Sequence, residues 1–243
     1  MTLSAKAFQR WLQGIAPDAS TADVCRVSGI KRTTLAQQLV RGKVSVSTVV
    51  SISRAYNINP VTALAGFGAY SVLAGPPQQP TRGELVSQVS TADLLRALLA
   101  RQAMEPARGA AAPGLGPAPH ATSVKNWVDA IDDGELRHRV SASTGVAPQN
   151  YSAQLTANRL SPELAVATAI AAGVGPASGL VATGIITEEE AGWPPGARQA
   201  ALNSLSDGEL TALAGERLQA LGKVLRRQEQ DQAQTEKIWE NLG

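Results

Sequence analysis

Residues 20–43 read STADVCRVSGIKRTTLAQQLVRGK, and this stretch predicts two short helices joined by a tight turn. Ser20 and Asp23 have the spacing of a helix N-cap and its partner three residues later. The first helix is expected to turn Val24 and Val27 toward the core. Gly29 then ends this helix, because glycine adopts the left-handed backbone that a tight turn between helices needs.

The second helix of the stretch is expected to bury one face and to expose long polar side chains on the other. Leu35 and Leu39 lie four residues apart and predict the buried face. Arginine, lysine and glutamine are the side chains that read guanine and adenine in a major groove. A solvated helix face with no partner is the alternative interpretation. The candidate DNA-binding residues are Lys31, Arg32, Thr33, Thr34, Gln37, Gln38, Arg41 and Lys43.

Residues 28–60, SGIKRTTLAQQLVRGKVSVSTVVSISRAYNINP, resemble the helix-turn-helix of the lambda-repressor/Cro-like family, in particular small repressors of actinobacterial phages. The resemblance covers roughly residues 18–62. One difference is an extra residue near Val40. The resemblance implies an operator-binding repressor of the kind that gives phage immunity. The matching motifs are Gly29, Arg32-Thr33-Thr34-Leu35, Gly42-Lys43 and Ile58 to Pro60.

Composition favours helices and places positive charge in the first part of the chain. Hydrophobic residues make up 44% of the 243 residues but aromatic residues only 4%, so the cores must consist of Ala, Val, Leu and Ile. No long β-branched alternation occurs, and no sheet is expected. Residues 1–102 contain 11 Lys and Arg against 4 Asp and Glu, a net charge of +7, whereas residues 103–243 have a net charge of −5. This asymmetry suggests that a polyanion binds the first part.

The second part of the chain repeats the first at an offset of 116 residues. The two segments align without a gap over some 90 residues, which indicates duplication of one helical unit. We therefore expect a first helix-turn-helix domain at 1–104, an Ala/Gly/Pro linker at 105–122, a second helix-turn-helix-like domain at 123–205 and a C-terminal helix at 206–243. The linker is expected to act as a flexible tether between separately folded halves. Matching pairs are Trp11/Trp127, Gly29/Gly145, Gln38/Gln154, Ser45/Ser161, Pro60/Pro176 and Arg101/Arg217.

The second candidate recognition helix differs chemically from the first. Lys31 and Arg32 are replaced by Ala147 and Pro148, so neutralisation of phosphates is expected to be weak. Asparagine and glutamine remain to read adenine, and Tyr151 or Pro148 is a candidate contact for a thymine methyl group. The alternative is a degenerate motif kept for packing. Its candidate DNA-binding residues are Gln149, Asn150, Ser152, Gln154, Asn158 and Arg159.

Two further segments could contact a membrane or a second copy of the chain. Residues 164–186 lack charge and are long enough to span a bilayer, but Gly173 and Pro176 would interrupt a spanning helix, so we expect a buried helix, a loop and another helix. The helix from Ser206 has an apolar stripe and glycines at 208, 215 and 222. It either pairs with a second copy as a homodimer or packs on its own domain.

Taken together, these patterns predict an all-α protein with two tandem helix-turn-helix units and a long C-terminal helix. The expected function is sequence-specific binding of double-stranded DNA as a transcriptional repressor, with no cofactor, metal, membrane or catalytic site. A cytoplasmic location is the default, since the N-terminus shows no signal-peptide pattern. Two alternatives remain: an adaptor whose second unit binds a protein, and an architectural DNA-binding protein with little sequence preference.

Overall fold

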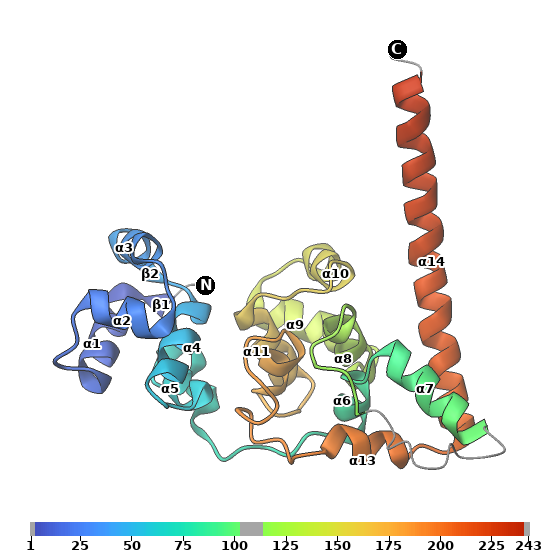
Figure 1. Ribbon diagram of the computed structural model, residues 1–243, viewed down its shortest axis with the longest axis horizontal. Helices are drawn as coiled ribbons and strands as arrows, with labels where there is room; N and C mark the ends of the chain where they lie inside the picture. Colours follow the sequence, from blue (N-terminus) through green and yellow to red (C-terminus); the bar gives the residue numbers. More distant parts are fainter. Residues whose placement is uncertain (1–2, 103–113, 241–243) are drawn as a thin grey trace. The chain divides into compact units, whose positions relative to one another are not determined.

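The computed structural model of the chain describes residues 3–102 and 114–240, with side chains described up to residue 235, and this described part is mostly helical (Figure 1). The expected all-α class is confirmed. The first half contains the elements β1 (Leu3–Ser4), α1 (Ala5–Ile15), α2 (Thr21–Ser28), α3 (Arg32–Val40), β2 (Lys43–Val44), α4 (Val46–Ala55), α5 (Pro60–Ala65), the 3₁₀ helix η1 (Gly68–Ala74), α6 (Arg82–Ser87) and α7 (Thr91–Gln102).

The second half follows the same order of helices. Shifting α3 and α4 by 116 residues reproduces the observed bounds of α10 and α11. Helix α12 overlaps the range that the shift gives α5, α13 begins one residue before the shifted start of α6, and α14 begins where the shift places α7. The elements are α8 (Ser123–Ile131), α9 (Leu136–Thr144), α10 (Pro148–Thr156), α11 (Pro162–Ala171), α12 (Ser178–Ala182), α13 (Ala197–Asn203) and α14 (Asp207–Glu240).

Residues that end and cap these helices explain why both halves fold alike. Ser20 accepts a hydrogen bond from Asp23 N at 3.2 Å, as expected for an N-cap. Gly29 and Gly145 end α2 and α9 with φ of 69° and 70°, the left-handed conformation that the turn requires. Val27 departs from expectation, because 48% of it is exposed just before this turn.

The chain divides into two compact units whose boundaries differ from the predicted domains. Unit 1 comprises residues 1–88 and 117–197, and unit 2 comprises residues 89–116 and 198–243. The first unit therefore contains segments from both predicted helix-turn-helix domains. Half of the predicted linker, residues 105–113, lies outside the described residues, while residues 117–122 belong to unit 1.

Within unit 1 the two halves share a hydrophobic core and are not separate. Leu180 and Trp193 from the second half lie in the same cluster as Phe8 and Leu35 from the first. Helix α6 packs on α8, where the buried carboxylate of Glu84 accepts a hydrogen bond from the indole of Trp127 at 3.3 Å. A second cluster fills the interior of α8 to α12.

Unit 2 is built from the equivalent C-terminal helices of the two halves. Helices α7 and α14 pack against each other in opposite directions, since Arg101 at the end of α7 donates to Leu205 O at 2.7 Å and contacts Asp207 at the start of α14. Leu94 and its equivalent Leu210 lie in one small apolar cluster. The start of α14 therefore packs on α7, its duplicate in the first half.

A two-stranded ladder corrects the expectation that no sheet forms. Strands β1 and β2 pair antiparallel, with Leu3 opposite Val44. The ladder is only two residues long on each side, which is why periodicity gives no sign of it. Residues 164–186 form α11, a loop and α12 as expected. Within the described residues, none of the helices combines the length and the hydropathy that crossing a bilayer needs.

Candidate nucleic-acid interface

Helix α3 buries one face and presents most of the predicted side chains to solvent. Leu35 is fully buried, which fixes the rotation of the helix against the core. The long polar residues then lie on the other side, as helical periodicity requires. The exposed candidates are Lys31, Arg32, Thr33, Thr34, Gln37, Arg41 and Lys43.

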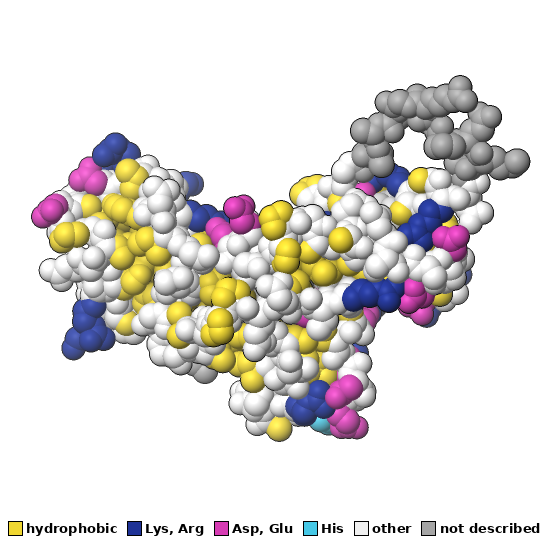
Figure 2. All heavy atoms as spheres, turned by 90° about the horizontal axis from the view of Figure 1, so that it is seen from below, with side chains coloured by type: hydrophobic (Ala, Val, Ile, Leu, Met, Phe, Trp, Pro, Cys, Tyr) yellow, Lys and Arg dark blue, Asp and Glu magenta, His cyan; other side chains and the backbone are white. Residues whose placement is uncertain are grey.

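The cations of this face are not neutralised by the protein. Within residues 3–102 and 114–235, neither an ion pair nor a hydrogen bond involves the side chains of Lys31, Arg32, Arg41 or Lys43. Arg26, by contrast, contacts Asp23 at 3.2 Å. Figure 2 views the molecule from the side away from α3 and α10, where Lys and Arg side chains lie scattered and several of them lie beside Asp or Glu side chains. The uncompensated charge beside α3 is suited to a polyanion.

Gln38 has a structural role that the sequence reading did not assign. It is only partly exposed, and its Oε1 accepts from Ser45 N at 3.0 Å and from the hydroxyl of Thr48 at 3.0 Å. These bonds tie the end of α3 to the start of α4. Only its amide nitrogen is left to donate to a ligand.

The end of α3 is shaped by a left-handed residue and the small ladder. The helix ends at Val40, which is 89% exposed, and Gly42 turns the chain with φ of 70°. Gly42 O accepts from Ala5 N at 3.0 Å, and Lys43 follows in β2. This arrangement fixes Arg41 and Lys43 directly after the candidate recognition helix.

Helix α10 occupies the equivalent position in the second half, but fewer of its candidates are available. Gln149, Asn150 and Arg159 are exposed, and Ser152 is half-buried. The other two candidates, Gln154 and Asn158, are engaged within the protein. Gln154 Oε1 accepts from Ser161 N at 3.2 Å, and Asn158 Oδ1 accepts from the backbone N–H groups of Val124 and Lys125 at 3.0 and 3.2 Å.

The suggestion that Tyr151 contacts a thymine methyl group is wrong. Its side chain is fully buried, and its hydroxyl lies 3.0 Å from the Thr168 hydroxyl on α11. The aromatic ring fills the position that Leu35 occupies on α3. Tyr151 is therefore a core residue whose polar atom is satisfied internally.

The charges around α10 are largely compensated. Lys125 pairs with Asp129, Arg139 with Asp133, and Arg137 lies 4.0 Å from Asp132. Arg159 is the exposed cation next to α10 that forms no ion pair with the described residues. Unpaired positive charge is accordingly scarcer beside α10 than beside α3.

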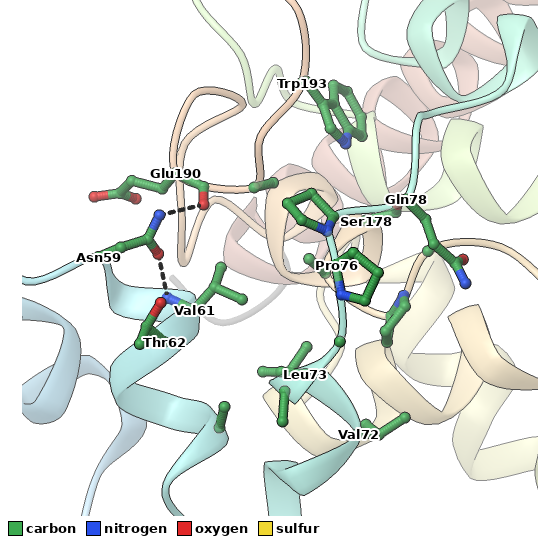
Figure 3. A pocket seen from close by; sticks show the side chains of 18 residues that line it. Asn59, Val61, Thr62, Val72, Leu73, Pro76, Gln78, Ser178, Glu190 and Trp193 are labelled. Atoms are coloured by element: carbon green, nitrogen blue, oxygen red, sulfur yellow. Dashed lines mark hydrogen bonds between the residues drawn. The ribbon is translucent and has the colours of Figure 1, made fainter.

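The halves of unit 1 are joined by a polar contact that the sequence reading missed. Arg54 donates through Nε to Glu190 Oε1 at 2.6 Å and through Nη2 to Oε2 at 2.7 Å. Asn59 Nδ2 donates to the backbone oxygen of Glu190 at 2.9 Å (Figure 3). Residues 188–190 form a turn in which Glu190 folds back onto Arg54. Its bond to Arg54 lowers the pKa of Glu190.

A cavity of about 410 Å³ lies beside this contact. It is bordered by α5, by residues 72–78, by residues 175–178 and by Trp193 (Figure 3). The amide of Asn59 at its rim is already engaged with Glu190 O and Val61 N. The cavity lies where the two halves meet within unit 1.

Comparisons with models of protein families, with curated proteins and with solved structures return no match for this chain.

Proposed function

We propose that this chain binds double-stranded DNA sequence-specifically and regulates transcription, most simply as a repressor, with α3 as its principal recognition helix. The observation that supports this most strongly is the set of exposed, unpaired cations on and after α3. Without a partner, the cations of this face repel one another. When DNA binds, the same cations neutralise its phosphates directly. The family resemblance of residues 28–60 points to the same function.

In this proposal the residues of α3 divide into two groups. Arg32 and Gln37 lie on the exposed face of the helix and would reach base edges in the major groove, where arginine pairs with guanine and glutamine with adenine. Arg41 and Lys43 follow the helix and would contact phosphates, which position the protein without reading sequence.

Helix α10 would be a second, unlike reader of the same site. Both α3 and α10 belong to unit 1, and in Figure 1 both lie along its upper edge. The exposed amides of Gln149 and Asn150 can read adenine, but the compensated charges nearby give little phosphate affinity. Because the two helices present different side chains, the operator would have unlike halves. Because both are held by one shared core, the spacing of those halves would be fixed.

A second candidate function is favoured by the charge of the second half. Residues 117–197 contain 4 Lys and Arg against 8 Asp and Glu, a net charge of −4. An acidic surface is repelled by phosphates, so α10 could instead bind a protein partner while α3 binds DNA. Selection of binding sites from random-sequence DNA decides between these functions, because an α10 that binds protein would leave no base preference in the DNA consensus.

The experiment is selection from random-sequence DNA followed by binding measurements at several salt concentrations. Arg32→Ala should weaken binding to the selected site by about 1–3 kcal/mol and relax preference at one base pair. Arg227→Ala is the matched control, since it removes one exposed arginine from α14 in unit 2. Equal binding by wild type and an Arg32→Ala, Gln37→Ala double variant would contradict the proposal. Unchanged selection by a Gln149→Ala, Asn150→Ala variant would restrict reading to α3.

A further inference from the structure

Helix α14 is far longer than the helix that covers it. It runs for 34 residues, whereas α7, its partner in unit 2, has only 12. Past the segment that packs on α7, apolar side chains between 44% and 54% exposed recur at helical spacing. We call this set the distal stripe; it consists of Leu218, Leu221, Val224 and Leu225.

The distal stripe continues an interface that already exists. Leu210 and Ala214 are buried in unit 2, and Leu213 packs beside them. Steps of three and four residues lead from Ala214 through Leu218 and Leu221 to Leu225, so these side chains follow one face of the helix. The face that packs on α7 is therefore the face that remains exposed further along.

The interface with α7 also shows what kind of partner this face accepts. Helix α7 is the first-half duplicate of the start of α14, and the two run antiparallel. The pairs Leu94/Leu210 and Ala97/Leu213 are related by the offset of 116, and all four residues lie in one cluster. A helix that packs on its own duplicate in this way has a self-complementary face, as isologous contacts require.

We propose that the distal stripe binds the same stripe of a second copy of this chain, antiparallel, about a two-fold axis near Lys223. In heptad terms Leu218 and Leu225 occupy position a and Leu221 position d. An antiparallel register about residue 223 aligns position d of each copy with position a of the other, and packs Leu221 of each copy on Leu225 of the other. Gly222 then lies at the crossing, and a Cβ built there meets nothing closer than 4.0 Å within its own chain, so packing inside the chain does not account for the glycine.

The charges beyond the stripe favour a second copy over a strongly charged partner. Arg226, Arg227, Glu229 and Asp231 are all exposed and balance one another. A uniformly acidic or basic helix would find half of these charges repulsive, whereas an identical antiparallel helix offers both signs. This inference concerns unit 2 and does not rest on DNA binding.

The test is the molecular mass of the full chain as a function of concentration, measured without DNA by sedimentation. The expected result is a reversible monomer–dimer equilibrium, with the association constant reduced at least tenfold by Leu221→Lys. Gln219→Lys is the matched control, because it adds the same charge on the opposite side of the same turn and should leave association unchanged. Leu221 is 46% exposed, so the thermal unfolding midpoint of the dilute monomer should not change. A chain that stays monomeric, or a dimer insensitive to Leu221→Lys, would overturn the proposal.

The orientation is tested by pulsed electron-spin distance measurement on a Gln234→Cys chain carrying a spin label. Gln234 is exposed, and the native Cys25 is buried and should not be labelled. An antiparallel pair centred near residue 223 separates the two labels by about 33 Å along the axis, from a rise of 1.5 Å per residue. A parallel pair would place them about one helix diameter apart, roughly 10–12 Å plus the label arms, and would refute the antiparallel arrangement.

Discussion

Replacing Glu190 by glutamine should weaken the contact between the two halves of unit 1 and so lower its stability. The substitution keeps the size of the side chain and one acceptor oxygen but removes the charge that faces Arg54. Both oxygens of Glu190 accept from the guanidinium at 2.6 and 2.7 Å, and the exposed fractions of the side chains are 17% for Glu190 and 44% for Arg54. The pair is thus bidentate and half-buried.

The expected loss in the free energy of unfolding is about 1–2 kcal/mol at pH 7. Exposed ion pairs contribute about 0.2–1 kcal/mol and broken buried pairs cost about 3–5 kcal/mol, and this pair lies between those limits. The measurement is urea unfolding followed by circular dichroism and tryptophan fluorescence. Glu189→Gln is the matched control: Glu189 is exposed, so the same change of charge one residue away should cost less than about 0.5 kcal/mol.

The loss should also depend on pH in a defined direction. The hydrogen bond from Arg54 lowers the pKa of Glu190 below its ordinary value of 4.5. A carboxylate with a lowered pKa stabilises the folded state above its unfolded pKa, and this stabilisation disappears as the pH falls through the folded value. Wild type and Glu190→Gln should therefore differ at pH 7 and converge in acid below pH 4.5. Equal stability of Glu190→Gln and Glu189→Gln at pH 7, or a difference that persists in acid, would refute the reasoning.

Three further substitutions test the fold around the candidate interface. Gln38→Ala should cost about 1–2 kcal/mol of unfolding free energy, because it removes the acceptor that joins α3 to α4, whereas Gln37→Ala on the exposed face should cost almost nothing. Gly179→Ala should destabilise unit 1 by more than about 2 kcal/mol in the same assay, since its Cβ would lie 2.2 Å from the backbone oxygen of Ala165. Tyr151→Phe should lower stability by about 1 kcal/mol and leave DNA affinity unchanged, because its hydroxyl pairs with a buried threonine on α11.

The sequence predicted local features well because they depend on nearby residues. The cap at Ser20 and the turn at Gly29 follow from side-chain chemistry within four residues. The offset of 116 predicted where helices recur, because duplicated helices keep their capping and core residues. Exposure of the α3 face followed from the spacing of Leu35 and Leu39.

Long-range contacts were beyond reach of the same reasoning. Arg54 and Glu190 lie 136 residues apart, and nothing in either local sequence indicates the other. The packing of α7 on α14 in unit 2 was missed for the same reason, since these helices are also far apart in the sequence. For the same reason, the prediction of a flexible tether between separately folded halves did not anticipate their shared core.

The substitution of one turn residue shows how duplicates can preserve a fold with different chemistry. In the first half Gly42 takes the left-handed conformation, and its carbonyl accepts from Ala5 N at the start of α1. The offset places Asn158 there in the second half, with φ of 50°, and its side chain accepts from Val124 N at the start of α8. Asparagine tolerates this conformation better than most residues, and its side chain bonds to the start of α8 much as the Gly42 carbonyl bonds to the start of α1, although the donors Val124 and Ala5 are not equivalent positions. Asn158 was a candidate base reader, but this bond occupies its oxygen.

Comparison of the two halves therefore separates the residues that hold the helices from those proposed to read DNA. Gln38 and Gln154 are identical because each accepts a backbone N–H at the start of the next helix, from Ser45 and Ser161. Identity between the halves thus marks structural need and gives no evidence of a shared DNA sequence. Exposed positions that differ, such as Arg32, are under no such restraint. Under the proposed function, the specificity of each half must lie at these differing positions, and exchanging them between α3 and α10 should exchange the preferred half-sites while leaving the unfolding free energy within about 0.5 kcal/mol.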